Sequence, residues 1–420
     1  MQDVFSVSIT IQGPSQTYSA SFQTEAKFEL GWQSVLKSAY GRAEIRCGCR
    51  GVGPKRLAVK YYEGTDKFSL ARFAMTGGQH APDCQYYSAG ATNSGAGSYA
   101  SGVIEDKGDG SVKIRLEIGM VQQTEAAAEA PGRDTAARKP SVKQSSMKLL
   151  GLLHYLWEEA GLNLWKPAFH GKRKASLAYW LVHTAAEDVW AGKLKLVDQL
   201  LLPAFSAESR EAQRNRSRVA SSCDAKRRMI IIAPLAAYTA ERMDAMGKQL
   251  KIGGFHGMPL AFMQTGLWDS TQRRFRNALA GWKQGHPTIV IAQIELKQRA
   301  NGVVGSVIDL GVMSITAEFI PVESSYERVV ANELVKQGRA FTKPMRYDAG
   351  ADHVLSDFVL TDTAVQVPLE VFGRDDPDYL KRKDEKTAYY DAQYGTEGWW
   401  GWEANTTGEH ATLPPFPLAG

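Results

Sequence analysis

Short stretches of apolar and β-branched residues, several of them alternating with polar residues, run through the first part of the chain. Such stretches occur at residues 4–11, 56–64, 68–75 and 111–120, and Gly, Asp and Asn lie between them. A period of two is typical of strands that bury one face, and the intervening residues favour turns. The pattern therefore predicts a mostly β domain over residues 1–121.

Residues 122–146 lack large apolar side chains except Val142 and are rich in Ala, Pro, Ser and charged residues. A segment of this composition cannot bury enough apolar surface to offset the entropy lost on ordering. We therefore expect a linker at residues 122–146, between the first domain and the rest of the chain.

Helical periodicity follows the linker and predicts a helical domain over residues 147–227. Its first helix has apolar residues at helical spacing, namely Leu149, Leu150, Leu153, Leu156 and Trp157. A second helix is expected at residues 176–190. Residues 208–228 are polar and basic, which predicts a flexible loop or an electrostatic contact with a partner.

The remainder of the chain mixes strands and helices. Strand patterns define a β-rich segment at residues 228–322, with runs at 228–238, 249–255, 287–296 and 306–320 and one helix at 271–282. The last segment, residues 323–420, has a helix, two strands and a second helix, at 325–341, 352–360, 365–373 and 378–394. The whole pattern predicts a multidomain α+β protein.

The composition is that of an ordinary globular protein, with 44% hydrophobic and 23% charged residues and a formal net charge of +5. It excludes global disorder, collagen and a coiled-coil rod. The longest smooth apolar run, residues 229–240, is shorter than the roughly 18 residues of a membrane-spanning helix. The first residues also lack the pattern of a signal peptide. We therefore expect a cytoplasmic protein without a membrane partner.

Three of the four cysteines lie close together in the sequence, and Cys223 is remote from them. Two pairs of candidate ligands are about thirty residues apart: Cys47 with Cys49, and His80 with Cys84. Thiolate and imidazole are the ligands that zinc prefers, and a closed tetrahedral site takes four of them. The four residues therefore predict a structural zinc site, with a β-hairpin between the two pairs.

The alternative is that these are buried free cysteines beside an incidental histidine, since free Cys is often a small apolar core residue. The surrounding sequence argues against it, because all three cysteines lie in polar, Gly-rich turns. A cytoplasmic setting also disfavours a disulfide. Zinc is therefore the favoured interpretation.

Acidic and basic residues of the last segment follow an order that suits phosphodiester hydrolysis. Glu327 lies in the first predicted helix, Asp357 begins the first strand and Glu370 lies in the second. Hydrolysis needs a divalent cation held by carboxylates and a positive charge near the attacking water. We expect Asp357 and Glu370 to bind Mg²⁺ or Mn²⁺, and Glu327 to support the site. Lys386 on the following helix, or else Lys383, is expected to activate the water.

This helix–strand–strand–helix order with Asp, Glu and Lys resembles the core of the PD-(D/E)XK nucleases. The resemblance implies a restriction-endonuclease-like α/β domain at residues 323–420. The usual lysine lies two residues after the Glu, and Phe372 occupies that position here. Some members of the superfamily are thought to supply the lysine from the following helix, as Lys386 or Lys383 would. If neither lysine reaches the site, the domain would bind nucleic acid without cutting it.

An alternative is that these charges are ordinary solvated ones. Asp357 and Glu370 argue against it, because each interrupts an apolar strand, where an unpaired carboxylate is costly. A literal Glu-x-Lys at Glu295 and Lys297 is a competing candidate. No Asp-bearing strand precedes it closely, and its polar residues alternate as on the wet face of a strand.

Two groups of basic residues are candidates for contacts with nucleic-acid phosphates. They are Arg210, Arg214, Arg216, Arg218, Lys226, Arg227 and Arg228, and the cluster Lys172, Arg173 and Lys174. The second group precedes a predicted helix, which is compatible with a winged-helix-like reader. In both cases the alternative is a solvated surface. The sequence has no Walker loop, HExxH, GxSxG or dinucleotide fingerprint, which disfavours ATP hydrolysis, zinc proteolysis and hydride transfer.

Four long blocks resemble a bacterial family of unknown function, whose members are typically found in integrative and conjugative elements and on plasmids. The blocks are GLLHYLWEEAGLNLW, QHAPDCQYY with its upstream CxC, IPVESSYERVV and RAFTKPMRYD. The resemblance spans the chain from about residue 40 to its end. It implies a mobile-element context, in which DNA processing, transfer and maintenance are the usual tasks.

We therefore expect a mobile-element-associated DNA-binding protein that acts as a Mg²⁺-dependent endonuclease, with DNA favoured over RNA as its partner. Two alternatives stay open. One is a catalytically inactive nucleic-acid-binding or assembly factor on the same fold. The other is a component of a conjugation or defence complex that binds only other proteins.

Overall fold

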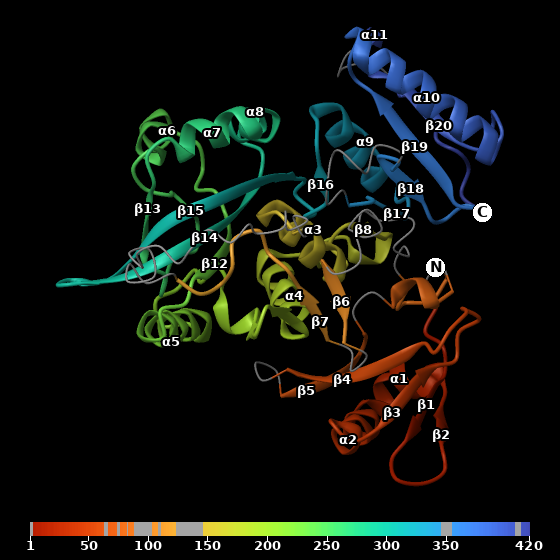
Figure 1. Cartoon of the computed structure of the whole chain (residues 1–420). Coiled ribbons are helices and arrows are strands. Elements are labelled where there is room, and N and C mark those ends of the chain that lie inside the picture. The colour runs from red at the N-terminus through yellow and green to blue at the C-terminus, as the bar shows by residue number, and fades with distance from the viewer. Residues whose placement is uncertain are drawn as a thin grey trace, which may run out of the picture. The chain divides into compact units, whose positions relative to one another are not determined.

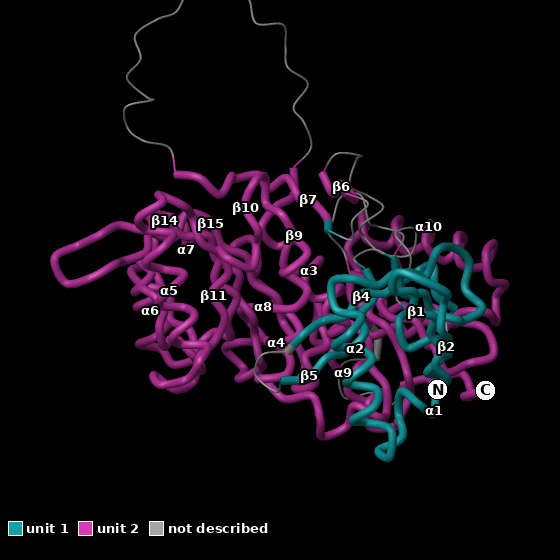
Figure 2. Tube along the Cα trace, turned by 90° about the horizontal axis from the view of Figure 1, so that it is seen from below, with its two compact units in different colours: residues 1–97, 108–111 teal, residues 98–107, 112–420 magenta. Residues whose placement is uncertain are grey.

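The computed structural model of the chain (Figure 1) has a mixed α+β fold. It describes residues 3–62, 66–73, 76–81, 83–87, 103–107, 111–122, 146–345, 355–407 and 413–420. The chain divides into two compact units, one of residues 1–97 with 108–111 and one of residues 98–107 with 112–420 (Figure 2). Residues 123–145 of the predicted linker lie outside the described residues. The five-part domain division stays a prediction.

Unit 1 is built on an antiparallel sheet of order β2-β1-β3-β4-β5. Its strands are β1 (Val7–Thr10), β2 (Gln16–Tyr18), β3 (Glu44–Cys47), β4 (Arg56–Tyr62) and β5 (Lys67–Arg72). Strands were expected at β1, β4 and β5, and these are confirmed. The unit also contains the helices α1 (Ala20–Thr24) and α2 (Glu29–Ala39).

Helix α2 has no counterpart in the strand pattern of residues 1–121. Its buried face consists only of Trp32, Leu36 and Ala39, four and three residues apart. These side chains pack with Val7 and Ile9 of the sheet in one apolar core. The helix thus covers the sheet with a narrow apolar stripe, which is why its signal in the sequence is weak.

The first part of unit 2 contains α3 (Leu149–Glu159) and α4 (Ala175–Glu187), which confirm the two expected helices. Short strands lie among them: β8 (Leu164–Trp165), β9 (Val189–Ala191), β10 (Leu194–Lys195) and β11 (Leu200–Leu201). Strands β6 (Ile104–Asp106) and β7 (Val112–Ile114) join β9 and β10 in a sheet of order β10-β9-β7-β6. Short 3₁₀ helices cover Ala26–Phe28 and Gly77–Gln79 in unit 1, and Pro167–Phe169 and Val197–Gln199 in unit 2.

The expectation of a flexible loop at residues 208–228 is wrong, because α5 (Arg210–Asp224) occupies most of it. The Ser209 side chain caps the helix by accepting a hydrogen bond from the Ala212 amide. The buried face is small and partly polar and repeats every three or four residues: Ala212, Asn215, Val219 and Ser222. The helix buries almost no large apolar residue, so apolar periodicity does not reveal it.

The main sheet of unit 2 has the order β11-β12-β14-β15-β13. Its larger strands are β12 (Met229–Pro234), β13 (Leu260–Met263), β14 (Thr288–Arg299) and β15 (Gly302–Ile315), and β16 (Pro321–Val322) pairs with β15. The strands expected at residues 228–238, 287–296 and 306–320 are confirmed. The strand expected at 249–255 is wrong, because this segment forms only isolated bridges, namely Gln249–Phe262, Leu235–Ile252 and Ala204–Phe255.

Three helices accompany this sheet: α6 (Ala240–Met246), α7 (Leu267–Arg274) and α8 (Arg276–Lys283). The single helix expected at 271–282 is interrupted at Phe275, whose φ of −119° is not helical. The core between helices and sheet includes Trp268, Leu279 and Trp282.

The C-terminal part runs α9 (Ser325–Lys336), β17 (Phe341–Thr342), β18 (Phe358–Leu360), β19 (Val367–Phe372), α10 (Pro377–Tyr394), β20 (Trp400–Glu403) and α11 (Ala404–Thr407). Its sheet has the order β20-β19-β18-β17-β8, with β19 and β20 parallel and the other pairs antiparallel. The expected elements are present with shorter strands. No helix in the described ranges is both long and apolar enough to cross a membrane.

Candidate functional site

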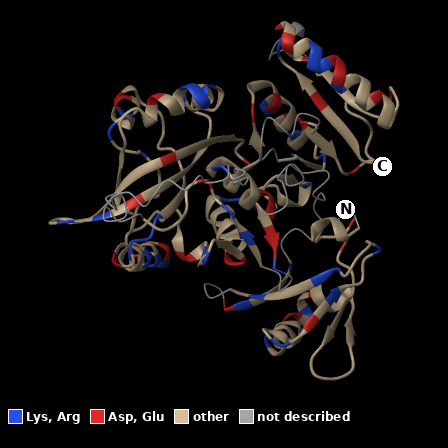
Figure 3. Cartoon of the chain, in the orientation of Figure 1, with Lys and Arg blue, Asp and Glu red and all other residues tan. Residues whose placement is uncertain are grey.

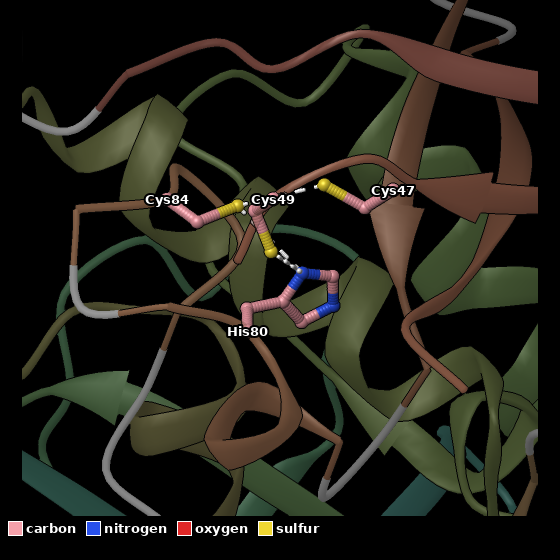
Figure 4. Close-up of side chains that lie close together, drawn as sticks. All are labelled: Cys47, Cys49, His80 and Cys84. Carbon is pink, nitrogen blue, oxygen red and sulfur yellow. Dashed lines mark hydrogen bonds between the residues drawn. The ribbon is translucent and has the colours of Figure 1, made fainter. Parts of the chain in front are cut away.

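Four side chains of unit 1 that can bind a metal ion meet in one buried cluster (Figure 4). Cys47 ends β3 and Cys49 follows it in the next turn, whereas His80 and Cys84 come after β5. The antiparallel hairpin of β4 and β5, paired from Leu57–Arg72 to Tyr62–Lys67, brings the two pairs together. The structure thus assembles all four predicted zinc ligands, and the hairpin expected between them is confirmed.

The distances within the cluster suit a tetrahedral ion. Cys47 Sγ lies 3.7 Å from Cys84 Sγ, and His80 Nδ1 lies 3.6 Å from both Cys49 Sγ and Cys84 Sγ. Zn–S bonds of about 2.3 Å and a Zn–N bond of about 2.0 Å in a tetrahedron require edges of roughly 3.8 Å and 3.5 Å. The cluster can therefore hold a metal ion such as zinc, and its four ligands leave no position open for a substrate.

Close backbone packing holds the two ligand loops against each other. A Cβ atom on Gly51 would lie 2.1 Å from the carbonyl oxygen of Gln79 and 2.5 Å from the Ala81 nitrogen. Only glycine fits at this position. Lys55 donates hydrogen bonds from its ammonium group to the carbonyl oxygens of Cys49 and Gly51, at 2.8 and 3.0 Å. The turn around Cys49 is therefore held by hydrogen bonds of the protein itself, in addition to any bond to a metal.

The surroundings of the sulfur atoms favour thiolates. The Ala81 amide lies 3.4 Å from Cys49 Sγ and the Tyr86 amide lies 3.5 Å from Cys84 Sγ, so that each can donate to sulfur. Without a metal, a hydrogen bond from the Cys84 thiol lowers the pKa of Cys47 to about 4, while the same interaction raises the pKa of Cys84. A dication would replace the shared proton and bind both sulfurs as thiolates.

A second candidate site lies in the C-terminal part of unit 2, at the strands β18 and β19. Asp357 directly precedes β18, and its amide donates to the Leu369 carbonyl oxygen of β19 at 3.1 Å, so that it lies beside the residue that precedes Glu370. Both carboxylates are buried, with 5% and 3% of their surface exposed. The Val371 amide donates to Asp357 Oδ2 at 2.8 Å and fixes its orientation.

Helix α10 supplies two partners for Glu370. Lys386 donates to one carboxylate oxygen and Tyr390 donates to the other, the latter at 3.0 Å. Lys383, three residues earlier, forms an ion pair with Glu403 at 2.6 Å instead. Of the two candidate lysines, Lys386 therefore contacts the predicted carboxylates. Phe372, at the position where the usual lysine would lie, is a buried core residue.

Glu327 is tied to the same region from α9. Ser324 caps the helix by accepting from the Glu327 amide at 3.1 Å, and the Glu327 carboxylate accepts from the Glu323 amide at 3.0 Å. This exchange resembles a capping box. It fixes the Glu327 side chain so that it points back over the first turn of the helix.

Lys343 is a further charged residue of this site, and the sequence patterns do not predict it. Its ammonium group lies 2.7 Å from Glu327 and 3.9 Å from Asp357, and the residue is 1% exposed. The available signal was a lysine directly after the buried residues Phe341 and Thr342 of a short strand. A lysine in such a place must be paired. Burial outweighs the attraction of Lys343 and, with repulsion from Asp357, raises the pKa of Glu327.

The two carboxylates Asp357 and Glu370 line a cavity of about 500 Å³ in unit 2. Arg276 from α8 and Arg374 after β19 line the same cavity, as do Tyr379 and Lys386. Burial raises the pKa of Tyr379 to about 12, so that its hydroxyl stays a neutral donor. The cavity therefore combines acidic residues at its base with arginines that can contact phosphates.

The acidic residues do not form a preassembled metal cage. Within the described residues, the ligand atoms of three or more His, Cys, Asp or Glu converge only in the Cys₃His cluster. Ammonium groups lie against the carboxylates instead, Lys343 at Glu327 and Lys386 at Glu370.

The competing Glu-x-Lys candidate lies on β14 and has a different environment. Both Nε and an Nη atom of Arg228 donate to Glu295, at 2.9 and 2.7 Å. Lys297 is exposed on the same strand. Glu295 therefore has a structural partner, and Arg228 is used within the fold.

The basic candidates differ in how they are used. Arg210, Arg214, Arg216 and Arg218 all lie on α5 (Figure 3). Lys226 and Arg227 follow the end of that helix. Lys172 and Lys174 are exposed, whereas Arg173 donates to the carbonyl oxygens of Gly161, Leu162, Leu164 and Glu318. Arg173 thus holds a loop together.

Comparison with known proteins adds a family. Residues 19–405 match a family described as "Protein of unknown function (DUF1173)". No curated protein and no solved structure matches the chain. Because the match covers most of the chain, the protein belongs to the DUF1173 family.

Proposed function

We propose that this protein is a DNA-binding protein of mobile genetic elements whose C-terminal domain, residues 323–420, is a metal-dependent endonuclease of the PD-(D/E)XK type. The observation that carries the proposal is that Asp357, directly before β18, and Glu370, on β19, line the same cavity, with Lys386 in contact with Glu370. These are the three residue types that metal-dependent hydrolysis of a phosphodiester needs.

The order of elements supports the same proposal. A helix, three strands, a second helix and a fourth strand follow one another as α9, β17, β18, β19, α10 and β20. The acidic residues lie at the first helix, before the second strand and within the third, in agreement with the resemblance to the PD-(D/E)XK core. The lysine comes from α10 rather than from β19, so that the helix takes over the role of the strand residue.

In this proposal Asp357 and Glu370 would hold Mg²⁺ or Mn²⁺, because hard divalent cations prefer carboxylate oxygens. The ion would act as a Lewis acid that polarises the scissile phosphate. Lys386 orients the attacking water and stabilises the charge that develops on the phosphate. Glu327 and Lys343 form the buried pair that positions Asp357. Arg276 and Arg374 bind the phosphates on either side of the scissile bond.

The Cys₃His cluster has a structural role in this proposal. It holds zinc and stabilises unit 1, whose sheet is small, and takes no part in the chemistry. Exposed basic residues of α5 and Lys172 and Lys174 add contacts to the DNA backbone.

A second candidate function is a nucleic-acid-binding or assembly factor that has lost catalysis. One observation favours it. Both carboxylate oxygens of Glu370 already accept hydrogen bonds, from Lys386 and Tyr390. A site stabilised by ammonium groups does not need a metal ion to fold.

A cleavage assay separates the two functions. Purified protein is incubated with single- and double-stranded DNA and RNA, with Mg²⁺, Mn²⁺ or EDTA, beside Asp357→Asn, Glu370→Gln and the control Glu295→Gln. Cleavage that requires metal and is lost in the first two variants but not in the third supports the endonuclease. Binding without cleavage supports the second function. Absence of binding at low salt, where phosphate contacts are strongest, contradicts both.

A further inference from the structure

A second cavity of unit 2, of about 370 Å³, lies between α4, α5 and the segment that joins β11 to α5. Its size is within the range of small-molecule sites, which is about 300–1,000 Å³. None of the carboxylates proposed for catalysis lines it. The cavity therefore needs an explanation of its own.

Two guanidinium groups line this cavity, those of Arg214 and Arg218 on α5. Arg218 is fixed in place, because it donates to the Leu200 carbonyl oxygen at 2.9 Å and lies 3.2 Å from Nε2 of His183. Arg214 is half-buried and, within the described part of the chain, makes neither a hydrogen bond nor an ion pair. Repulsion from Arg214, together with burial, lowers the pKa of Arg218 to about 10. The two positive charges are therefore brought together without a buried carboxylate between them.

His183 adds neither a positive nor a negative charge to the cavity, so the two arginines keep their attraction for an anion. Burial and the two arginines lower the pKa of His183 to about 3, so that its ring is neutral. A neutral ring can accept the hydrogen bond from Arg218 at Nε2. The one carboxylate that lines the cavity, Glu211, is exposed in the first turn of α5.

Tyr179 on α4 adds an unused polar group. The residue is 5% exposed, lines the cavity, and its hydroxyl has no hydrogen-bond partner among the residues that the structure describes. The hydroxyl is therefore available to donate to, or accept from, a polar ligand in the cavity. The hydroxyl and the unpaired Arg214 thus point independently to a polar ligand.

The rest of the lining is apolar and partly aromatic. Phe205 lines the cavity and is 61% exposed, beside Leu202, Pro203 and Trp180. Large exposed aromatic residues next to positive charge are typical of surfaces that stack nucleobases. An inorganic anion would leave this apolar surface uncovered. A molecule that carries both a phosphate and a planar ring would contact the arginines and the apolar surface together.

We infer that the cavity between α4 and α5 binds a nucleoside phosphate, with its phosphate on Arg214 and Arg218 and its base against Phe205. The phosphate also lies near the capped N-terminus of α5, whose dipole favours an anion. The same chemistry is present in a free nucleotide and in an unpaired nucleotide of a DNA strand. The inference rests on this cavity alone and holds whether or not the C-terminal domain cuts DNA.

The test is calorimetric titration of the full-length protein, without added divalent cations, with three probes: dAMP, a 5′-phosphorylated single-stranded oligodeoxynucleotide, and inorganic phosphate. We expect one or both nucleotide probes to bind, and Arg214→Gln and Tyr179→Phe to weaken binding, the former at least tenfold. Arg273→Gln is the matched control, because it removes the same charge from an exposed position of α7 that does not line the cavity. Its affinity is expected within twofold of the wild type.

The three probes identify the source of the ligand. Binding of dAMP assigns the cavity to free nucleotides, and binding of the oligonucleotide alone assigns it to a DNA strand. Equal losses in Arg214→Gln and Arg273→Gln would mean diffuse electrostatic attraction and would overturn the inference. So would an affinity for inorganic phosphate equal to that for dAMP, or the failure of both nucleotide probes to bind at millimolar concentration and low salt. Arg214 makes no hydrogen bond to any residue that the structure describes, so we expect its variant to fold.

Discussion

The ammonium group of Lys343 lies 2.7 Å from the carboxylate of Glu327, with only 2% and 7% of the two side chains exposed. Removing one partner of a buried ion pair leaves an uncompensated charge, which costs about 3–5 kcal/mol. We therefore expect Lys343→Met to lower the free energy of unfolding by that amount, as measured by urea denaturation.

The double variant Lys343→Met with Glu327→Gln is expected to recover most of this loss, because no buried charge is left without a partner. Its Gln side chain can still accept from the Glu323 amide. If the double variant were as unstable as the single one, Lys343 would act through packing and not through charge.

Lys386 and Lys383 provide a matched pair for the proposed chemistry, since both lie on α10 and only Lys386 contacts Glu370. We expect Lys386→Met to lower kcat for DNA cleavage by roughly 100-fold, the loss typical of one group that stabilises a transition state. Lys383→Met is expected to retain kcat within a few-fold. A loss that is larger in Lys383→Met would exclude Lys386 as the group that orients water.

Metal content tests the Cys₃His cluster. Because a structural zinc site couples metal binding to folding, we expect about one equivalent of zinc per chain and a loss of unit 1 structure on chelation. Cys49→Ser is expected to lower the zinc content to less than half an equivalent. Cys223→Ser is the control, since this half-buried cysteine on α5 lies outside the cluster. Elemental analysis and limited proteolysis of unit 1 give the readouts.

His183 predicts a pH dependence of stability. Burial lowers its folded-state pKa to about 3, below the value of about 6.5 in an unfolded chain. A histidine with a depressed pKa contributes stability above pH 6.5 that is lost as the pH falls toward 3. Between pH 7 and pH 5 its contribution should fall by about 2 kcal/mol.

The comparison is made between the wild type and His183→Gln, whose side chain can accept from Arg218 without titrating. Urea denaturation at pH 7 and pH 5 should show the larger loss of stability in the wild type. Parallel losses in the two proteins would mean that His183 is protonated at little cost in the folded state.

The sequence predicts those parts of the structure whose signals are local. Cys47, Cys49, His80 and Cys84 could be identified because their surroundings in the sequence are polar rather than apolar, although Cys47 ends strand β3, and because their residue types leave little chemical choice. Asp357 and Glu370 could be identified because each interrupts an apolar strand. In both cases the residue type is unusual for its place in the sequence, and ordinary core packing does not explain it.

The rest depends on contacts between distant residues. The ion pair of Lys343 with Glu327 joins the residue after strand β17 to helix α9. Nothing near Lys343 in the sequence specifies this partner. Helix α5 was expected as a loop because Ala212, Asn215 and Ser222 bury little apolar surface. The partner of Lys383 is Glu403, which belongs to the later strand β20, so the sequence near Lys383 does not show that Lys383 pairs away from Glu370.

Cys47 and Cys84 are 37 residues apart in the sequence, and the hairpin of β4 and β5 lies between them. A metal bound to both pairs closes this loop like a cross-link, which by chain entropy alone disfavours the unfolded state by about 4 kcal/mol. Because closure entropy grows only with the logarithm of loop length, doubling the loop would change this by only about 0.6 kcal/mol. Relatives can therefore differ widely in the length of this hairpin while keeping the same metal centre.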